Sequence, residues 1–295
     1  MHQRGAELLR PDSPRDGVDF PHDALLRARR ARALRPTLTL DPLANRGQIA
    51  RGAGCEAPGQ RLSKDDISIK HIGIVAVSAE GAALCYRTIC AEGAAQFGRH
   101  MHPEITMHTL PLGRYMRHIE AGRWDEAGEM MLGSARKLVG RGAELLLCPD
   151  NTAHQALDLV IDRAPRHWLH IAEELASVAS TRHFAKVGLL GTRYLMEGPV
   201  YPPKLAERGI AFEIPPAEDR AEINRIIFDE LVNGRFTERD RNYFRGAIER
   251  LRIRGCDAVA LSCTEIPLLI SERDSSLPIL DSTRILARAA LREAA

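Results

Sequence analysis

Residues 137–152 read KLVGRGAELLLCPDNT, and residues 250–265 read RLRIRGCDAVALSCTE. Each segment starts with a helical pattern, passes a glycine (Gly142 or Gly255), and continues as a short apolar run typical of a buried parallel strand. A glycine just past a helix suits a left-handed cap. Aligning the glycines pairs Asp150 with Cys263 at an offset of 113 residues, each eight residues after its glycine.

A second pair of segments extends this repeat. AKVGLLGT (185–192) resembles KHIGIVAV (70–77), which pairs Gly188 with Gly73 at an offset of 115 residues. Two βαβ units can resemble each other by chance. The common order of the segments and their nearly equal offsets favour a duplicated architecture instead.

Strand-like and helix-like patterns alternate from residue 69 onward. The expected strands of the first half are 69–77, 104–112 and 143–148, and the expected helices are 81–97, 126–142 and 152–164. Such alternation predicts an α/β fold with parallel sheets and right-handed crossovers.

Composition limits the possible functions. The chain has 295 residues, 44% apolar content and a formal net charge of +2. This allows one large or two small domains and gives no strong field for nucleic acid or membranes. No apolar run reaches the length of about 18 residues that a membrane span needs. The six cysteines form no CxxC pair, which indicates a reducing, cytoplasmic location.

The first 66 residues differ from the rest. They are rich in arginine, with RARRARALRP at 27–36, and show no sustained apolar period. We expect a disordered N-terminal extension. A targeting or nucleic-acid-binding arm is the alternative, although no apolar segment of a secretory signal follows the arginines.

The paired positions lie where ligands bind in doubly wound sheets, at the carboxyl ends of strands. Thr152 and Thr264 follow closely and are expected to open helices. Helix N-termini there would hold a carboxylate and lower the pKa of a nearby thiol. Two such ends would clasp one small anion, with Asp150 and Cys263 on opposite sides.

Several motifs resemble, in their joint order, the cofactor-independent aspartate/glutamate racemase superfamily. The likeness covers residues 69–295 and leaves the N-terminal extension unmatched. SCTEIPLL (262–269) is similar to the family's GCTEIPLL, and DNTAH (150–154) to its CNTxH. The other matching stretches are VGLLGTRYLMEGPVY (187–201), EDRAEINRIIFDEL (218–231) and LPILDSTRILARAA (277–290).

The resemblance implies two pseudo-symmetric, doubly wound parallel-sheet domains with the active site between them. The expected first domain is 67–165 plus 284–295, and the second is 166–283. The resemblance also implies a homodimer without pyridoxal phosphate. In such racemases one cysteine removes the α-proton as a thiolate and another protonates the opposite face. This chain has Asp150 at the first position and AVSAEG (76–81) where the family has GGMSPE, so Ser78 is the expected equivalent of that serine.

Each candidate residue has a structural alternative. Cys263 is the expected acid/base, although most thiols in apolar strands are buried packing residues. Asp150 is either a base, a substrate contact or an N-cap. Glu265 either orients the thiol or complements a helix dipole. We expect Cys148 to point into the core and His154 to be a packing residue. The expected contacts to the substrate are Ser78, Asn151, Thr152, Thr192, Thr264 and Glu265.

Four cations are candidates for contacting a distal group of the substrate. They are Arg114, Arg117, Arg193 and Lys204. For each of them, a solvated surface charge is the interpretation that we favour. The histidines show no metal-binding spacing, so no metal and no cofactor are expected.

The sequence supports three hypotheses about function. The first is an isomerase, an amino-acid racemase or epimerase with Cys263 and Asp150 as catalytic residues. The second is a single-cysteine decarboxylase or a cis-trans isomerase of small dicarboxylates from the same superfamily. The third is a non-catalytic amino-acid-binding protein. All three have a small-molecule partner and neither a nucleic-acid nor a membrane partner.

Overall fold

The computed structural model describes residues 69–295, so the expected N-terminal extension of 66 residues lies outside the described part. The first half of the described chain alternates strands and helices, as the sequence predicts. Its elements are β1 (Ile72–Ala76), α2 (Ala79–Phe97), β2 (Ile105–Thr109), α3 (Leu112–Ile119), α4 (Trp124–Val139), β3 (Leu145–Leu147), α5 (His154–Leu157), a 3₁₀ turn (Ile161–Arg163) and β4 (Trp168–Leu169).

The second half repeats this plan with more helical segments. It starts with α6 (Ile171–Thr181), β5 (Lys186–Leu190), α7 (Arg193–Met196), α8 (Pro202–Ala206), β6 (Ala211–Glu213) and α9 (Ala217–Arg225). A π-helical turn (Ile226–Glu230) and a 3₁₀ turn (Leu231–Asn233) follow. The remaining elements are α10 (Glu238–Ile253), β7 (Ala258–Leu261), α11 (Ile266–Leu269), a 3₁₀ turn (Glu272–Asp274), β8 (Ile279–Asp281) and α12 (Ser282–Ala294).

The eight strands form two parallel four-stranded sheets with the same strand order. The first sheet runs β2-β1-β3-β4 and the second β6-β5-β7-β8. The register pairs Gly73 of β1 with Leu146 of β3, and Gly188 of β5 with Val259 of β7. This confirms the predicted duplication. The two glycines at the heart of the repeat, Gly142 and Gly255, both adopt positive φ, at 97° and 85°.

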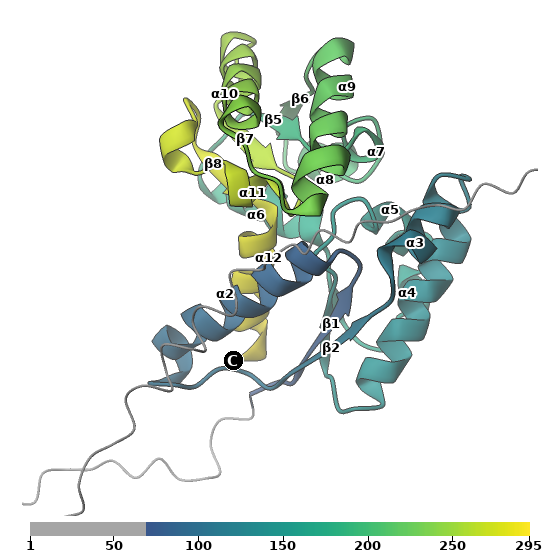
Figure 1. Ribbon diagram of the computed structural model, residues 1–295. Coiled ribbons are helices and arrows are strands. Elements are labelled where there is room, and N and C mark those ends of the chain that lie inside the picture. The colour runs from purple at the N-terminus through teal and green to yellow at the C-terminus, as the bar shows by residue number, and fades with distance from the viewer. Residues whose placement is uncertain (1–68) are drawn as a thin grey trace, which may run out of the picture. The chain divides into compact units, whose positions relative to one another are not determined.

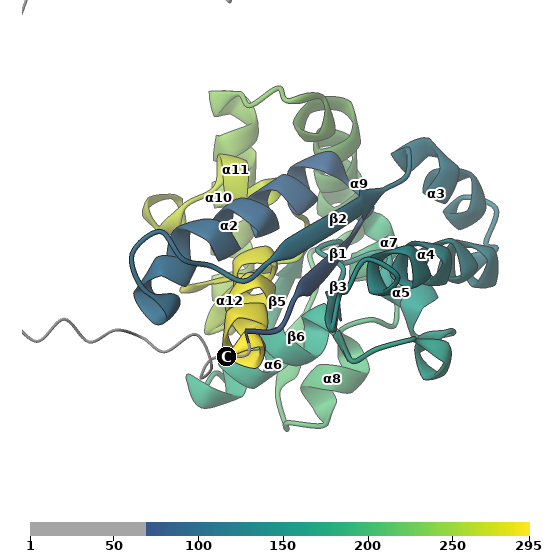
Figure 2. The ribbon, with the colours of Figure 1, turned by 90° about the horizontal axis from the view of Figure 1, so that it is seen from below.

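Helices cover both faces of the first sheet. Alternate residues of β1 and β3 pack on opposite sides, as a strand's period of two requires. Ile72, Ile74, Leu145 and Leu147 join one buried cluster with residues of α2 and α12. Val75, Leu146 and Cys148 join another with residues of α3 and α4. Figures 1 and 2 show α12, the last helix of the chain, lying beside α2 from the first half.

The second sheet is covered in the same way. Val187, Leu189, Ala258 and Ala260 pack with residues of α6 and α8. Leu190, Val259 and Leu261 lie on the other side with residues of α9 and α10. Both sheets are thus buried on two faces, which explains why their strands read as continuous apolar runs.

Two predicted elements are wrong in part. The expected helix 152–164 is broken into α5, turns and a 3₁₀ turn, with Leu159 60% exposed between them. The expected strand 104–112 ends at Thr109, because Pro111 precedes the first residue of α3. Proline fixes its own φ and has no N–H to donate, so it favours the start of a helix over a strand.

The helices of the described residues include none that is both long and apolar enough to cross a membrane.

Candidate active site

The carboxyl ends of β1, β3, β5 and β7 border one pocket of about 540 Å³, part of which opens to solvent. All eight predicted site residues line it. From the first half come Ser78, Asp150, Asn151 and Thr152, and from the second come Thr192, Cys263, Thr264 and Glu265. The strand order explains this convergence. β1 and β3 are neighbours, as are β5 and β7, so the residues just past their ends share one edge of each sheet.

Cys263 lies two residues beyond β7 and is only 6% exposed. Its Sγ donates a hydrogen bond to Oε2 of Glu265, at 3.0 Å. Burial raises the pKa of this thiol well above its usual value, and the neighbouring Glu265 carboxylate raises it further. The backbone N–H of Glu265, at the start of α11, does lower the thiol pKa, as expected, but burial and the Glu265 carboxylate outweigh it, so the expectation of a lowered pKa overall is wrong. The following helix, α11, has only four residues and begins at Ile266, and a carboxylate lies beside the sulfur.

A short hydrogen-bonded chain connects this thiol to the other half of the protein. Thr264 Oγ1 donates to Oε2 of Glu265 at 2.8 Å, and lies 3.1 Å from Oγ of Ser78. Ser78 in turn caps α2 by accepting from the N–H of Gly81 at 3.2 Å. Glu265 is 4% exposed. A buried carboxylate persists only when it is hydrogen-bonded, and two donors supply that here.

Asp150 occupies the equivalent place beyond β3. Its Oδ1 accepts from the N–H of Ala153 at 2.9 Å, so it closes a turn. Burial raises the pKa of this carboxyl to about 6, with a smaller contribution from the charge of Glu265, while the Ala153 hydrogen bond opposes the rise. The capping role and a proton-transfer role are compatible in one side chain. A carboxyl with a pKa near 6 exists in both protonation states close to neutral pH.

Asn151 and Thr152 use their side chains to join the two halves. Asn151 donates to Ser282 Oγ at 3.0 Å and accepts from the Tyr201 hydroxyl at 2.6 Å. The Ser282 hydroxyl in turn donates a hydrogen bond to the carbonyl of Leu261 at 2.9 Å. Thr152 and Thr192 lie 2.9 Å apart through their hydroxyls. The Asn151 side chain thus fixes the geometry of the pocket, which the sequence did not predict.

His154 is fully buried and has both ring nitrogens occupied. Nε2 accepts from the N–H of Ile171 at 3.2 Å, so the ring carries its proton on Nδ1 and donates it to the carbonyl of Asp150 at 2.8 Å. Burial is the main cause that lowers its pKa to about 3. A neutral imidazole whose two nitrogens both have partners within the protein holds the Asp150 backbone, and its one N–H proton is already donated to that carbonyl. This agrees with the predicted packing role.

Cys148 points into the core, as predicted. It is fully buried in the cluster that contains Tyr115 and Met131, and burial raises its thiol pKa. Cys263 is therefore the single cysteine that lines the pocket in the described part of the chain. Within residues 69–295, no three His, Cys, Asp or Glu side chains gather as metal ligands would.

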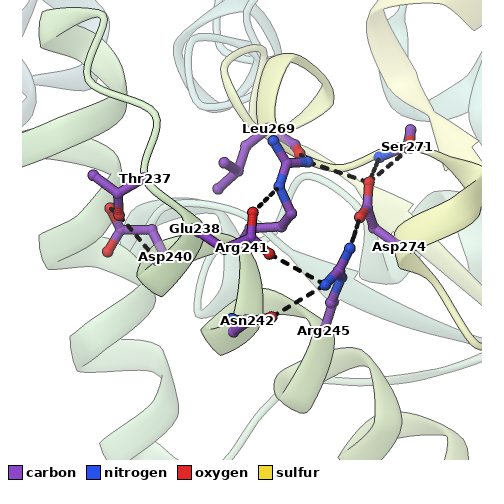
Figure 3. Close-up of polar contacts among 9 residues, drawn as sticks. All are labelled: Thr237, Glu238, Asp240, Arg241, Asn242, Arg245, Leu269, Ser271 and Asp274. Carbon is purple, nitrogen blue, oxygen red and sulfur yellow. Dashed lines mark hydrogen bonds and ion pairs between the residues drawn. The ribbon is translucent and has the colours of Figure 1, made fainter.

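Ion pairs fix the segment after α11 onto α10 (Figure 3). Ser271 donates to Asp274 Oδ2 through its N–H at 2.9 Å and its hydroxyl at 2.7 Å. Arg241 and Arg245 of α10 donate to the same carboxylate. The Ser271 hydrogen bonds, with help from Arg245, hold the pKa of Asp274 well below its usual range. These contacts anchor the chain downstream of Cys263 on α10.

The sequence missed an apolar part of the lining. Its members are Val77, Leu112, Met116, Ile119, Tyr194, Ile227, Phe228 and Val232. Leu112, Met116 and Ile119 lie at helical spacing on α3, an element that the sequence reading did not predict. Their i, i+4, i+7 pattern is the signal that could have identified them.

Asp150→Asn should raise the stability of the protein at alkaline pH. The carboxyl pKa is raised from 3.8 to about 6, so its ionisation destabilises the folded state. The full shift in pKa would correspond to about 3 kcal/mol of unfolding free energy. Because the residue is only half-buried, we expect about 1–2 kcal/mol at pH 8. The amide keeps an oxygen for the Ala153 N–H.

This gain should shrink as the pH falls through about 6 and vanish below about 4, where the carboxyl is protonated in both folded and unfolded chains. Urea unfolding of both proteins at pH 8, 6 and 4 measures it. A difference that stays constant, or grows in acid, would disprove the assignment of the raised pKa.

Gly81→Ala should destabilise the junction between the two halves. A Cβ at this position would lie 2.6 Å from the carbonyl oxygen of Pro149 and 2.6 Å from Cγ2 of Thr264. Overpacking of this kind costs about 1–3 kcal/mol. Gly133→Ala in α4 is the matched control, since no atom lies within 4 Å of its added Cβ and the change should stabilise the helix by about 0.5–1 kcal/mol. Thermal unfolding of both variants tests the difference in sign.

Comparison with known proteins places this geometry in a family. The family model described as Asp/Glu/Hydantoin racemase matches residues 72–290. A crystal structure from Yersinia pestis, described as a candidate Asp/Glu racemase, is 32% identical, with a TM-score of 0.71, and the match covers 76% of this chain and 99% of that one. An aspartate racemase homologue from Pyrococcus horikoshii OT3 is 28% identical, with a TM-score of 0.66 and coverage of 76% and 99%.

A more distant likeness supports the fold. The aspartate racemase of Picrophilus torridus is 23% identical, with a TM-score of 0.62 and coverage of 76% of this chain and 94% of that one. The family match spans most of the chain, and the strand order, the repeated strand ends and the shared pocket agree with it. The chain therefore belongs to the Asp/Glu/Hydantoin racemase family.

Proposed function

We propose that the protein is a cofactor-independent amino-acid racemase or epimerase that removes the α-proton of its substrate with one side chain and adds a proton to the opposite face with another. One observation carries this proposal. Cys263 and Asp150 stand at equivalent strand ends of the duplicated fold and line the same pocket. Inverting a carbon centre requires a base on one face and an acid on the other. A thiol and a carboxyl on opposite halves of the protein meet that requirement.

The proton transfers balance without a cofactor. Glu265, which already accepts the Cys263 hydrogen bond, takes the thiol proton. The thiolate removes the α-proton, so the C–H bond breaks, an S–H bond forms and the electron pair stays on carbon. Asp150 in its acid form donates a proton to the opposite face and becomes a carboxylate. Proton transfer from Glu265 to Asp150 through solvent restores the starting state.

The unusual pKa values suit this division of work. The raised thiol pKa makes the thiolate scarce but strongly basic, which a weakly acidic α-proton requires. The Asp150 pKa of about 6 makes its acid form a ready proton donor. An α-ammonium group near Glu265 and Asp150 would favour the charged thiolate.

The remaining polar residues are suited to hold the substrate carboxylate. Ser78, Thr152, Thr192 and Thr264 bring four hydroxyls to the pocket lining. Two of them come from each half, so a carboxylate bound by both would be fixed relative to both proton-transfer groups. The homodimer and the cytoplasmic location implied by the resemblance stay predictions.

Chiral chromatography tests the proposal. Single enantiomers of a panel of amino acids are incubated with protein dialysed against a chelator, without added pyridoxal phosphate. We expect at least one member to convert to its mirror image, and the conversion to be lost in Cys263→Ala. A panel without any interconversion would contradict the proposal.

The presence of a single thiol in the pocket favours a second candidate function. A carboxyl group opposite one cysteine is compatible with decarboxylation of a malonate or with cis-trans isomerisation of maleate, where only one proton donor acts on carbon. Release of carbon dioxide, or conversion of maleate, would identify this chemistry. Its absence across malonates and maleate would leave racemisation as the better account.

A further inference from the structure

The pocket has a polar floor and an apolar wall on separate elements. The floor consists of the polar residues just past the strand ends, including both proton-transfer candidates. The wall comes from α3, Tyr194, the π-helical turn with the residues after it, and Val77, the apolar residue just past β1. Its members are Val77, Leu112, Met116, Ile119, Tyr194, Ile227, Phe228 and Val232. A substrate whose reacting carbon lies on the floor would extend its side chain along this wall.

Several side chains of the wall are only partly buried in the protein core. Leu112, Met116 and Tyr194 are half-buried and pack against the core of the first half. Phe228 and Val232 are also half-buried. Phe228 lies in the π-helical turn, and such turns are common at functional sites because they alter the direction of side chains. Apolar surface that faces a pocket and is only partly covered is typical of a ligand-binding wall.

The pocket lining that residues 69–295 form contains no basic side chain, that is, no lysine, arginine or histidine. Arg114 and Arg117 are exposed on α3, and the Lys204 ammonium pairs with Glu173. The Arg193 guanidinium lies 5.9 Å from the centre of the Tyr194 ring and borders a different hollow. The four cations considered from sequence therefore contribute no side chain to the lining.

Two acidic side chains line the pocket, those of Asp150 and Glu265. A zwitterionic amino acid with an uncharged side chain brings no net charge into this site. Aspartate or glutamate would bring a second carboxylate, which would have to lie against an apolar wall without a cationic partner. Burying an unpaired charge is strongly unfavourable. The apolar wall and the two acidic groups therefore both disfavour a substrate with a carboxylate in its side chain.

We propose that the pocket selects α-amino acids with an uncharged, apolar side chain, aliphatic or aromatic, over aspartate and glutamate. This inference rests on the proposed function, because it concerns the substrate of the same site. Met116 is a specificity-determining residue in this account, since it stands on the wall and is half-buried.

The experiment compares deuterium incorporation at the α-carbon of leucine, methionine, phenylalanine, aspartate and glutamate by NMR. In the wild-type protein we expect the apolar amino acids to exchange at least tenfold faster than the two dicarboxylates. Met116→Lys, which places a cation on the wall with a side chain of similar length, should reduce this ratio at least tenfold. Met107→Lys makes the same change on β2, outside the pocket, and should leave the ratio unchanged.

Ligand-induced thermal stabilisation separates this inference from the proposed function. If dicarboxylates exchange as fast as apolar amino acids, the inference is wrong and the racemase proposal stands. If nothing exchanges, the racemase proposal fails. Stronger stabilisation by the apolar amino acids would then still support the selectivity, and stronger stabilisation by dicarboxylates, or none by any member, would contradict it. Val232→Lys serves as a second wall variant if Met116→Lys fails to fold.

Discussion

Cys263→Ser should reduce the rate of amino-acid interconversion about 1,000-fold. General acid–base groups contribute about 10²–10⁴-fold to catalysis, and a serine hydroxyl is far less acidic than a thiol. The substitution keeps a donor for Glu265, which now receives the thiol hydrogen bond at 3.0 Å. Loss of activity would thus report the lost chemistry of sulfur and not a broken network. The measurement is kcat from chiral chromatography at saturating substrate.

Two matched cysteine variants control for a packing effect. Cys148→Ser and Cys256→Ser change buried thiols that lie outside the pocket lining. Each should lose stability because a hydroxyl replaces a buried sulfur, while kcat measured below the melting transition stays within about threefold of the wild-type value. Retention of full activity in Cys263→Ser, or an equal loss in the controls, would refute the role of Cys263.

Asp150→Asn should separate proton exchange from racemisation. The amide preserves the turn, since its oxygen can still accept from the Ala153 N–H that lies 2.9 Å from Asp150 Oδ1. It cannot deliver a proton to the second face of the carbanion. We expect interconversion to fall about 10²–10³-fold. Since the other face of the carbanion is then no longer protonated, Cys263 has time to exchange the abstracted proton with solvent and return deuterium to the same face, so one enantiomer becomes labelled with retention of configuration. NMR in deuterated water and chiral chromatography measure the two processes on the same sample.

Asp150→Cys is the complementary variant. A thiol restores a group that can transfer a proton at this strand end, so interconversion should recover above the level of Asp150→Asn. If Asp150→Asn racemises as fast as the wild type, Asp150 is only the cap of a turn. If exchange and interconversion fall together, the two faces are not served by separate groups.

The repeat explains why so much of the candidate site was predictable. Two glycines with left-handed conformations and two apolar runs fixed the alignment of Asp150 with Cys263, and parallel strands bring such positions to a common edge. The eight predicted site residues line one pocket for this reason. The order of the strands alone places these residues at one edge, so their proximity can be predicted without knowing how the side chains pack.

The features that sequence reasoning missed depend on packing between distant segments. The pKa of Cys263 rises because core residues surround it and Glu265 lies 3.0 Å away, whereas the expected helix dipole is limited by the four residues of α11. Asn151 contacts Ser282, 131 residues later in the chain. The apolar wall combines α3 with a π-helical turn more than a hundred residues away. Contacts between segments so far apart in the sequence leave no local pattern from which they could be predicted.

In the proposed mechanism, two different groups serve the two faces of the substrate carbon. The most direct measurement follows the deuterium label during the first few per cent of conversion of a single enantiomer in deuterated water. Opposed groups predict that the newly formed enantiomer carries deuterium at its α-carbon, while the remaining starting enantiomer is unlabelled. Equal labelling of both enantiomers from the start would indicate one group acting on both faces and would rule out this mechanism.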